Sequence, residues 1–278
     1  MNGLIERAAN DLVNCKYAVA LTGAGISTES GIPDFRGPDG VWTKDPRAEE
    51  EAYEHYGQLL RDPKGHWEEI LDGKNIISIF DKFPDYPPNR GHLALVNLER
   101  MGILKSVITQ NADGLHQKAG SRTVLEYHGG MDKLRCMNCG ERFLKNAFDL
   151  QKMRAEGSLP PRCPGCNGVL KYDGVYFKES IPSDVVQRSL EEAGKCDLML
   201  VCGTSAVVYP FAELPRIARQ RTGRAGKRVT IIEVNGEPTP LTEEGVSDYL
   251  VQGRIGEVLP RIVEEARRLR NNTLSSGK

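Results

Sequence analysis

The chain has 278 residues, 39% of them hydrophobic, and its 37 basic and 38 acidic side chains leave a formal net charge of −1 at pH 7. This length can bury one large core, or one core with a small satellite. The balanced charge argues against a broad basic face, so we expect no direct nucleic-acid binding. No apolar stretch reaches the length of a membrane span, so we expect no membrane partner. Cys15, Cys196 and Cys202 stand outside any regular spacing, and such unpaired thiols favour a reducing, cytoplasmic location.

Short apolar segments alternate with helical patterns along most of the chain. Strands are expected at residues 16–22, 104–109, 123–126, 197–202 and 228–234, with a weaker one at 249–251. Helices are expected at residues 4–14, 89–101, 183–193, 209–219 and 256–268. Because the strands are apolar on both faces and helices separate them, the pattern predicts a buried parallel sheet. The fold class is therefore α/β, a doubly wound Rossmann-like sheet.

Two insertions interrupt this pattern. The α/β domain is expected to comprise residues 1–36, 89–132 and 172–270. Residues 37–88 are rich in charge, proline and glycine, with a helical stretch at 47–60, and have too little apolar surface for a core. We predict that they form a mobile helical lid over the first strand–helix loop. Residues 133–171 are expected to form a small zinc-binding module, and the polar residues 271–278 a disordered tail.

Cys136, Cys139, Cys163 and Cys166 form a C-x-x-C…C-x-x-C pattern within the second insertion. Tetrahedral zinc is well served by four thiolates, which two close pairs supply with little strain. Two structural thiol pairs or a redox C-x-x-C are the alternatives, although redox motifs occur singly at a helix start. Four cysteine ligands leave no position for a water, so we predict one structural Zn²⁺, without which the module cannot fold.

The first predicted strand runs into a glycine-containing loop. Gly23 and Gly25 permit a tight turn and a close backbone approach to a pyrophosphate. The dinucleotide fingerprint has a third glycine where Thr28 stands here, and the acidic ribose ligand expected further along is missing. The loop alone indicates a phosphate or dinucleotide site, with a plain strand–helix turn as the alternative.

The longer string GAGISTESGIPDFR at residues 23–36 resembles the signature of the sirtuins, the NAD-dependent protein deacylases. Further blocks follow in the family's order: TQNADGLH at 109–116, HG at 128–129, the four cysteines, VYFKE at 175–179, GTS at 203–205 and NGE at 235–237. The resemblance covers about residues 12–265, nearly the whole chain.

The resemblance implies removal of an acyl group from protein lysines, with NAD as co-substrate and release of nicotinamide and O-acyl-ADP-ribose. Acylated-lysine proteins would be the partners. His128 would be the catalytic base that deprotonates a ribose hydroxyl, for which a near-neutral pKa is suitable. Asn111 would be the second catalytic residue, ordering the ribose hydroxyls and a water.

The resemblance also implies which residues bind NAD. Asp113 would accept a hydrogen bond from the nicotinamide carboxamide and the Ala112 amide would donate one, although a polar run after a strand is otherwise a loop with a helix cap. Phe35 would cover the sugar face, and Arg36 would approach the phosphates. The cofactor-binding residues implied are Gly23, Ala24, Gly25, Ile26, Ser27, Asp34, Phe35, Arg36, Gln110, Asn111, Ala112, Asp113, Gly203, Thr204, Ser205, Asn235, Glu237 and Ile255.

The segment implied to bind substrate departs from the family pattern. Val175, Tyr176 and Phe177 would pair with the acyl-lysine peptide as an added strand. Lys178 stands where the family usually has glycine. It would either favour acidic peptides or point to solvent without effect.

Sirtuins that remove acidic acyl groups resemble one another in a Tyr-x-x-Arg pair on the lid. The residues that follow Trp67 contain neither tyrosine nor arginine up to residue 73, so we predict neutral acyl groups. An ADP-ribosyltransferase or NAD hydrolase is the alternative activity, and a non-catalytic NAD-binding module is a third. An acetyl-lysine peptide assay with NAD separates them by its products.

Overall fold

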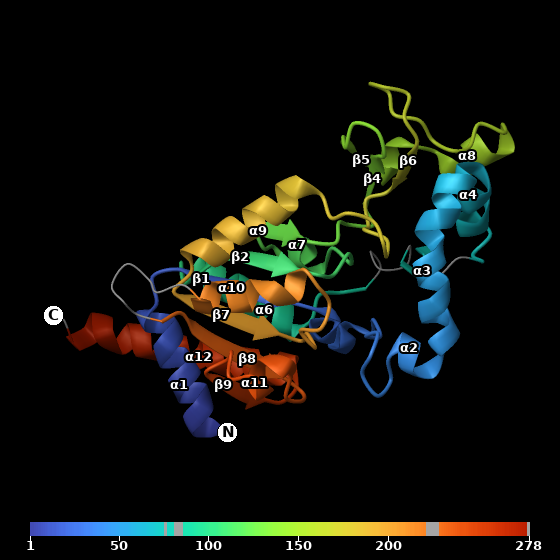
Figure 1. Ribbon diagram of the computed structural model, residues 1–278. Coiled ribbons are helices and arrows are strands. Elements are labelled where there is room, and N and C mark those ends of the chain that lie inside the picture. The colour runs from blue at the N-terminus through green and yellow to red at the C-terminus, as the bar shows by residue number, and fades with distance from the viewer. Residues whose placement is uncertain (75–76, 81–85, 221–227, 277–278) are drawn as a thin grey trace.

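The computed structural model describes residues 1–74, 77–80, 86–220 and 228–276. Six parallel strands form one sheet in the order β3-β2-β1-β7-β8-β9 (Figure 1). Their bounds are Ala18–Thr22 (β1), Leu104–Thr109 (β2), Val124–Glu126 (β3), Leu198–Cys202 (β7), Thr230–Asn235 (β8) and Tyr249–Gln252 (β9). Every strand expected from the sequence is present, and the doubly wound α/β class is confirmed.

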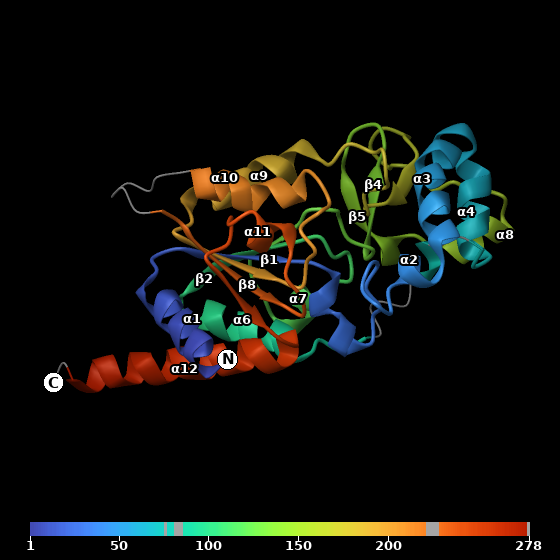
Figure 2. The same ribbon diagram turned by 60° about the horizontal axis from the view of Figure 1, so that its bottom comes forward.

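Helices cover both faces of this sheet (Figure 2). One face carries α1 (Asn2–Asn14), α6 (Arg90–Arg100) and α12 (Ile255–Ser276), and the other carries α9 (Ser183–Lys195), α10 (Leu214–Gln220) and α11 (Pro240–Glu243). Strand β1 shows how the sequence builds both cores: Ala18 and Ala20 pack in the first layer, and Val19 and Leu21 pack in the second. Alternate side chains of a strand point to opposite faces, so an entirely apolar strand must lie between two layers.

The strand order reverses between β1 and β7, and in such sheets ligands bind outside the carboxyl ends of the strands at this point. The loops that leave these two strands touch. The Gly25 amide donates to the Gly203 carbonyl at 2.8 Å, and a Cβ on Gly23 would lie 2.8 Å from the same oxygen. Gly203 has φ +62°, in the left-handed region, and a Cβ there would lie 2.4 Å from the Ile26 nitrogen. The glycines are therefore required because any side chain at these positions would prevent the two loops from touching.

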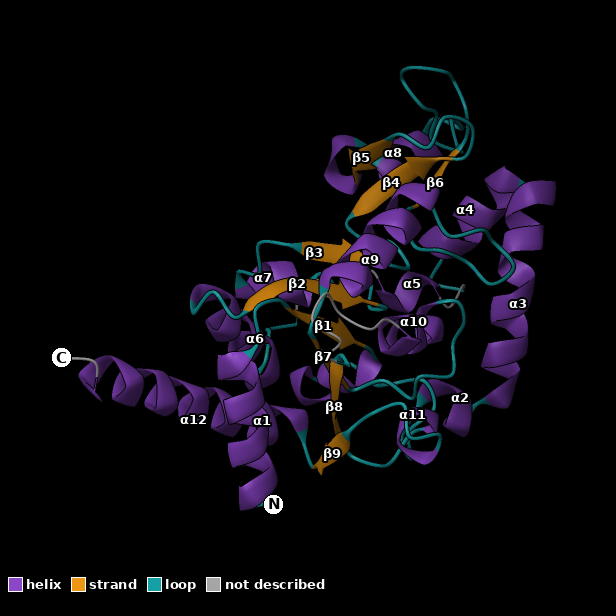
Figure 3. Ribbon diagram, turned by 60° about the vertical axis from the view of Figure 1, so that its left-hand side comes forward, coloured by secondary structure: helices purple, strands orange, loops and turns teal. Residues whose placement is uncertain are grey.

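The two insertions lie together at one end of the sheet (Figures 1 and 3). A second, antiparallel sheet has the order β5-β4-β6, and helix α8 follows β5 in the chain. The described residues of the lid segment form four helices, of which α3 and α4 lie beside this sheet. The bounds are Lys133–Cys136 (β4), Arg142–Leu144 (β5), Leu170–Tyr172 (β6), Leu150–Ala155 (α8), Val41–Lys44 (α2), Pro46–Arg61 (α3), Pro63–Leu71 (α4) and Ile77–Phe80 (α5).

The lid segment, which has too little apolar surface for a core of its own, shares a core with the cysteine-bearing sheet. Trp67, Ile70 and Ile77 pack in one buried cluster with residues of that sheet, including Leu170. The Trp67 ring lies 5.2 Å from the Tyr172 ring, and its Nε1 donates to the Leu170 carbonyl at 2.9 Å. Each segment alone lacks enough apolar surface, and the two together bury it.

The disordered tail predicted from residue 271 is wrong for residues 271–276, because α12 continues to Ser276. A helix that is already nucleated gains a hydrogen bond for each residue added, so even a polar sequence can extend it. Arg270 near this end donates to the Met101 carbonyl. Residues 277–278 lie outside the described part of the chain. Among the described helices, none combines the length and the hydropathy that a membrane span requires.

Trp67→Ala should lower the free energy of unfolding by about 3–5 kcal/mol, because the lost ring leaves a cavity in the core that the two insertions share. Denaturant unfolding monitored by circular dichroism measures the change. Leu60→Ala is the matched control: Leu60 is 56% exposed on α3, so its removal should cost less than about 0.5 kcal/mol. Equal effects of the two changes would contradict the shared core.

Candidate functional site

A cavity of about 1160 Å³ opens at the carboxyl edge of the parallel sheet, between the sheet and the insertions. Its walls are the loops that follow β1, β2, β7 and β8, together with residues 174–181. The expected catalytic, cofactor-binding and substrate-binding residues that line it are Gly23, Ala24, Gly25, Ser27, Asp34, Phe35, Arg36, Gln110, Asn111, Ala112, Asp113, His128, Val175, Tyr176, Phe177, Gly203, Thr204, Ser205, Asn235, Glu237 and Ile255. Ile26 does not line it, because its side chain is 1% exposed and belongs to the core.

The loops after β1 and β2 share a buried polar network. The Asn111 Nδ2 donates to the Gly23 carbonyl and to the Ser27 Oγ, each at 3.1 Å. The Ser27 hydroxyl donates to the Asp113 Oδ2 at 2.6 Å, and the Leu115 amide donates to the Asp113 Oδ1 at 2.9 Å. Asp113 therefore accepts from the first amide of α7 (Leu115–Ala119), whose N-cap residue is Gly114. Each carboxylate oxygen has two lone pairs, so it can still accept from a ligand.

Thr204 joins three of the loops. The Gln110 Nε2 donates to its Oγ1 at 2.8 Å, and the Asn235 Nδ2 donates to its carbonyl at 2.8 Å. Behind them, the fully buried Glu233 carboxylate accepts from the hydroxyls of Thr239, Thr242 and Ser247. The loop that carries Asn235 and the exposed Glu237 is thereby fixed to the sheet.

The residues at the start of the lid contact one another. The Asp34 Oδ1 accepts from the Gly37 amide at 2.9 Å, which closes a turn. The Phe35 ring lies 4.7 Å from the Trp42 ring. Arg36 stacks over Trp42 at 4.3 Å and pairs with Glu49 at 3.1 Å, so its guanidinium must leave an acidic partner to reach a phosphate.

His128 follows β3 at the carboxyl edge of the sheet and lines the cavity. Burial lowers the pKa of His128 to about 4, and a hydrogen bond with the Gln110 backbone opposes this shift. The near-neutral pKa expected from the sequence is therefore wrong, because desolvation disfavours the imidazolium. At pH 7 the ring is neutral and has a lone pair with which to accept a proton.

Two further histidines lie beneath the network. The His116 Nε2 is 2.9 Å from the Thr22 Oγ1, and the His92 Nε2 is 3.5 Å from the Ser27 Oγ. Burial lowers the pKa of His92 to about 4 and that of His116 well below its usual range. They support the Ser27–Asp113 pair from below as neutral rings. The sequence did not reveal this arrangement, because it joins β1 and the loop that follows it to α6 and α7.

The segment expected to pair with substrate is irregular in this structure and ends in a turn at residues 177–178. The Val175 amide donates to the His128 carbonyl at 2.8 Å. Lys178 has φ +67°, a conformation that favours glycine, which accounts physically for the family's usual residue here. Its Nζ lies 3.4 Å from the Glu54 Oε1 on α3, and the two side chains are 61% and 69% exposed, so Lys178 is a solvent-exposed cation that pairs with the lid.

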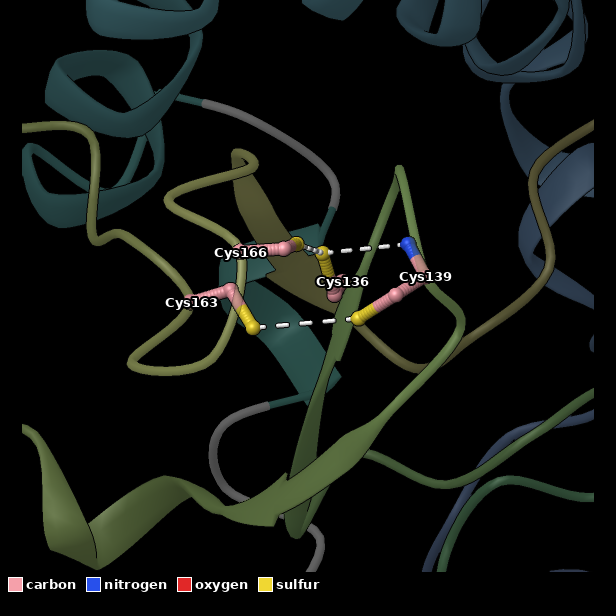
Figure 4. Close-up of side chains that lie close together, drawn as sticks. All are labelled: Cys136, Cys139, Cys163 and Cys166. Atoms are coloured by element: carbon pink, nitrogen blue, oxygen red, sulfur yellow. Dashed lines mark hydrogen bonds between the residues drawn. The ribbon is translucent and has the colours of Figure 1, made fainter.

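The four cysteine sulfurs all lie within 4.8 Å of one another (Figure 4). The Sγ atoms of Cys136 and Cys166 are 3.5 Å apart, and those of Cys139 and Cys163 are 3.8 Å apart. A zinc tetrahedron with bonds of about 2.3 Å has edges of about 3.8 Å, so the residues fit the metal. A Cβ on Gly168 would lie 2.8 Å from the Cys136 Sγ, so only glycine leaves room for the cluster.

Comparison with known proteins decides the family. The model of the Sir2 family matches residues 23–210. The chain belongs to the Sir2 family. A Sir2-family relative from Archaeoglobus fulgidus, named NAD-dependent protein deacylase 2, is 46% identical over 275 residues, which is 98% of this chain and 99% of that protein. The NAD-dependent protein deacylase of Pyrococcus abyssi is 42% identical over 267 residues, which is 96% of this chain and 99% of that protein.

Solved Sir2 structures have the same fold. One from a study of the mechanism and regulation of Sir2 enzymes is 44% identical and aligns with a TM-score of 0.75 over 97% of this chain and 100% of that one. A Sir2 homologue in complex with NAD is 38% identical, with a TM-score of 0.75 over 95% of this chain and 94% of that one. Sir2Af2 bound to a myristoylated histone peptide is 39% identical, with a TM-score of 0.67 over 98% of this chain and 100% of that one.

The sequence analysis missed the part of the cavity wall that comes from the insertions. Trp42, Ala52, His55 and Ile77 from the lid line the cavity, as does Met131 at the edge of the second insertion. Apolar residues at helical spacing on the lid indicate that one helix face is buried. They do not reveal which part of the protein that face packs against.

Cys136→Ala should abolish zinc binding and unfold the small sheet, because three thiolates cannot close the tetrahedron that holds β4 to the loop at 163–166. Zinc content by atomic absorption and melting by differential scanning fluorimetry check this. Cys15→Ala, at a thiol outside the cluster, is the control and should keep its zinc. A zinc-free Cys136→Ala variant with an unchanged melting temperature would contradict a structural role for the zinc.

The free energy of unfolding should fall as the pH is lowered from about 6.5 towards 4. Burial holds the pKa of His66, His92 and His128 at about 4, whereas an unfolded histidine titrates near 6.5. The unfolded chain therefore binds more protons in this window, and each such histidine contributes a slope of about 1.4 kcal/mol per pH unit. Urea unfolding at pH 7.5, 6.0 and 5.0 with zinc in excess measures it. His66→Gln should flatten the dependence, and an unchanged slope would count against the buried neutral ring.

Proposed function

We propose that this protein is an NAD-dependent protein deacylase that removes neutral acyl groups from lysine side chains and releases nicotinamide and O-acyl-ADP-ribose. One observation carries the proposal: His128, Asn111 and Asp113 line a single cavity with both glycine-containing loops of a doubly wound sheet. The relatives that match almost the full length of the chain are named NAD-dependent protein deacylases. A pure binding module has no use for a base at this position.

In this proposal, NAD lies at the carboxyl ends of β1 and β7, where the strand order reverses. The loops at residues 23–27 and 203–205 hold the two phosphates, because glycine lets the main chain come close. Asn235 and Glu237 bind the adenosine ribose. Ile255 contacts adenine through its backbone, which agrees with its side chain being 4% exposed in the core.

The other end of the cavity holds nicotinamide. The Asp113 carboxylate accepts from the carboxamide NH₂, and the Ala112 amide donates to its oxygen. The contacts of Asp113 with Ser27 and Leu115 support this role, because they orient the carboxylate and leave lone pairs available. Gln110 lies under the nicotinamide ribose, and Asn111 orders its hydroxyls.

Bound NAD supplies the ribose carbon to which the acyl oxygen becomes attached. Neutral His128 accepts a proton from a ribose hydroxyl, and burial keeps the ring unprotonated above about pH 4. Phe35 excludes water from the sugar face once nicotinamide has left. Arg36 exchanges Glu49 for a phosphate as the lid closes.

Val175, Tyr176 and Phe177 pair with the peptide backbone of the acylated protein. Apolar side chains of Trp42, Ile77 and Met131 line the cavity from the insertion side, which supports neutral acyl groups. Residues 67–73 offer no cation that could neutralise an acyl carboxylate. One zinc ion held by the cysteine cluster is structural. The absence of nucleic-acid binding and the cytoplasmic location remain predictions.

His128→Ala should reduce deacylation of an acetyl-lysine peptide by roughly 10²- to 10⁴-fold and leave NAD affinity nearly unchanged, because the base acts after the nucleotide has bound. Chromatography of nicotinamide and O-acetyl-ADP-ribose measures turnover, and calorimetry measures NAD binding. Nicotinamide without the acetylated product from the wild-type enzyme would favour ADP-ribosyl transfer or NAD hydrolysis instead. Near wild-type turnover in His128→Ala would mean that another group is the base.

A further inference from the structure

Strand β6 carries a buried cation that the proposed mechanism does not use. Lys171 is 1% exposed and lies directly opposite Arg135 of β4. Two cations facing each other across neighbouring strands repel unless anions lie between them. Glu179 supplies that anion: its Oε1 accepts from Arg135 at 2.8 Å, and its Oε2 lies 3.0 Å from the Lys171 Nζ. Arg135 also pairs with Asp173, with 2.8 Å between the Arg135 Nε and the Asp173 Oδ1.

The Lys171 ammonium is fully hydrogen bonded. It donates to the Tyr172 carbonyl at 2.8 Å and to the Gly174 carbonyl at 2.7 Å, and Glu179 takes its third N–H. An ammonium has three N–H groups, so none is left over. Burial lowers the pKa of Lys171 to about 8, and the charge of Glu179 opposes the shift.

All of these acceptors belong to residues 172–179, the segment that reaches the proposed peptide site. The Glu179 Oε2 also accepts from the Tyr176 amide at 2.9 Å. The Tyr176 ring covers the ammonium, with Nζ 4.4 Å from its centre. Within the same segment, the Val175 amide donates a hydrogen bond to the His128 carbonyl. Lys171 therefore contacts both ends of the segment, through Gly174 and Glu179, and Arg135 holds the same Glu179.

We propose that Lys171 is a positioning residue for the acylated peptide, holding residues 173–179 in the shape that pairs with the substrate backbone. This inference rests on the proposed function, since it concerns the same peptide site. A segment that is already ordered loses little conformational entropy when the peptide adds to it. Lys171 touches neither NAD nor the acyl group, so its effect falls on peptide binding.

The test compares Lys171→Met with Lys152→Met, a change at a 68% exposed lysine of the same insertion. Lys171→Met should raise the KM for an acetyl-lysine peptide roughly ten- to a hundredfold, with the KM for NAD and the zinc content close to wild type. Lys152→Met should leave all three values unchanged. Calorimetry of the peptide without NAD gives the same comparison independently of turnover, so a wild-type protein that lacks deacylase activity would contradict the proposed function alone.

Lys171→Met leaves Glu179 without one of its cationic partners. A second variant, Lys171→Met with Glu179→Gln, removes both charges of this pair. Its glutamine oxygen can still accept from the Tyr176 amide, and it should restore stability without restoring peptide affinity. Wild-type peptide affinity in a zinc-loaded Lys171→Met protein would overturn the proposal. Loss of zinc and of the folded state in both variants would also overturn it, because Lys171 would then act only in stability.

Discussion

The contact between the glycine loops after β1 and β7 is the constraint on which the site depends. Gly25 and Gly203 bring two backbones together at a separation that no side chain permits. This contact closes the point where the strand order reverses, so residues of both loops line one cavity. Any larger residue at Gly203 would separate the loops, and the cavity would lose one wall.

The second constraint is the burial of polar groups behind these loops. Ser27, Asn111 and Asp113 satisfy one another, and Thr204 links Gln110 to Asn235. Buried polar groups are costly unless hydrogen bonded, so such a network has few alternative arrangements. The same burial that orders the network also lowers the pKa of His128, which makes the ring a weaker base but keeps it unprotonated.

The two insertions act as one body that forms the far wall of the cavity. Trp67 of the lid packs against the cysteine-bearing sheet, and Phe177 contacts Trp42 and Tyr53 of the lid. The cysteine cluster is therefore connected to the cavity wall through packing, because Cys136 and Cys163 share a core with Ile77 and Met131. The charged cluster around Lys171 is the link between that sheet and the segment beside His128.

The sequence alone determined the parallel sheet, because strands apolar on both faces must lie between two helical layers, as Val19 and Ala20 do. It also determined the zinc ligands, because the spacing of Cys136 and Cys139 is itself a geometric requirement. Tertiary structure decided what depends on distant partners: the shared core of the lid, the pKa of His128, the pairing of Lys178 with Glu54, and the burial of Lys171. Each of these follows from residues that meet only after folding, and local periodicity carries no information about them.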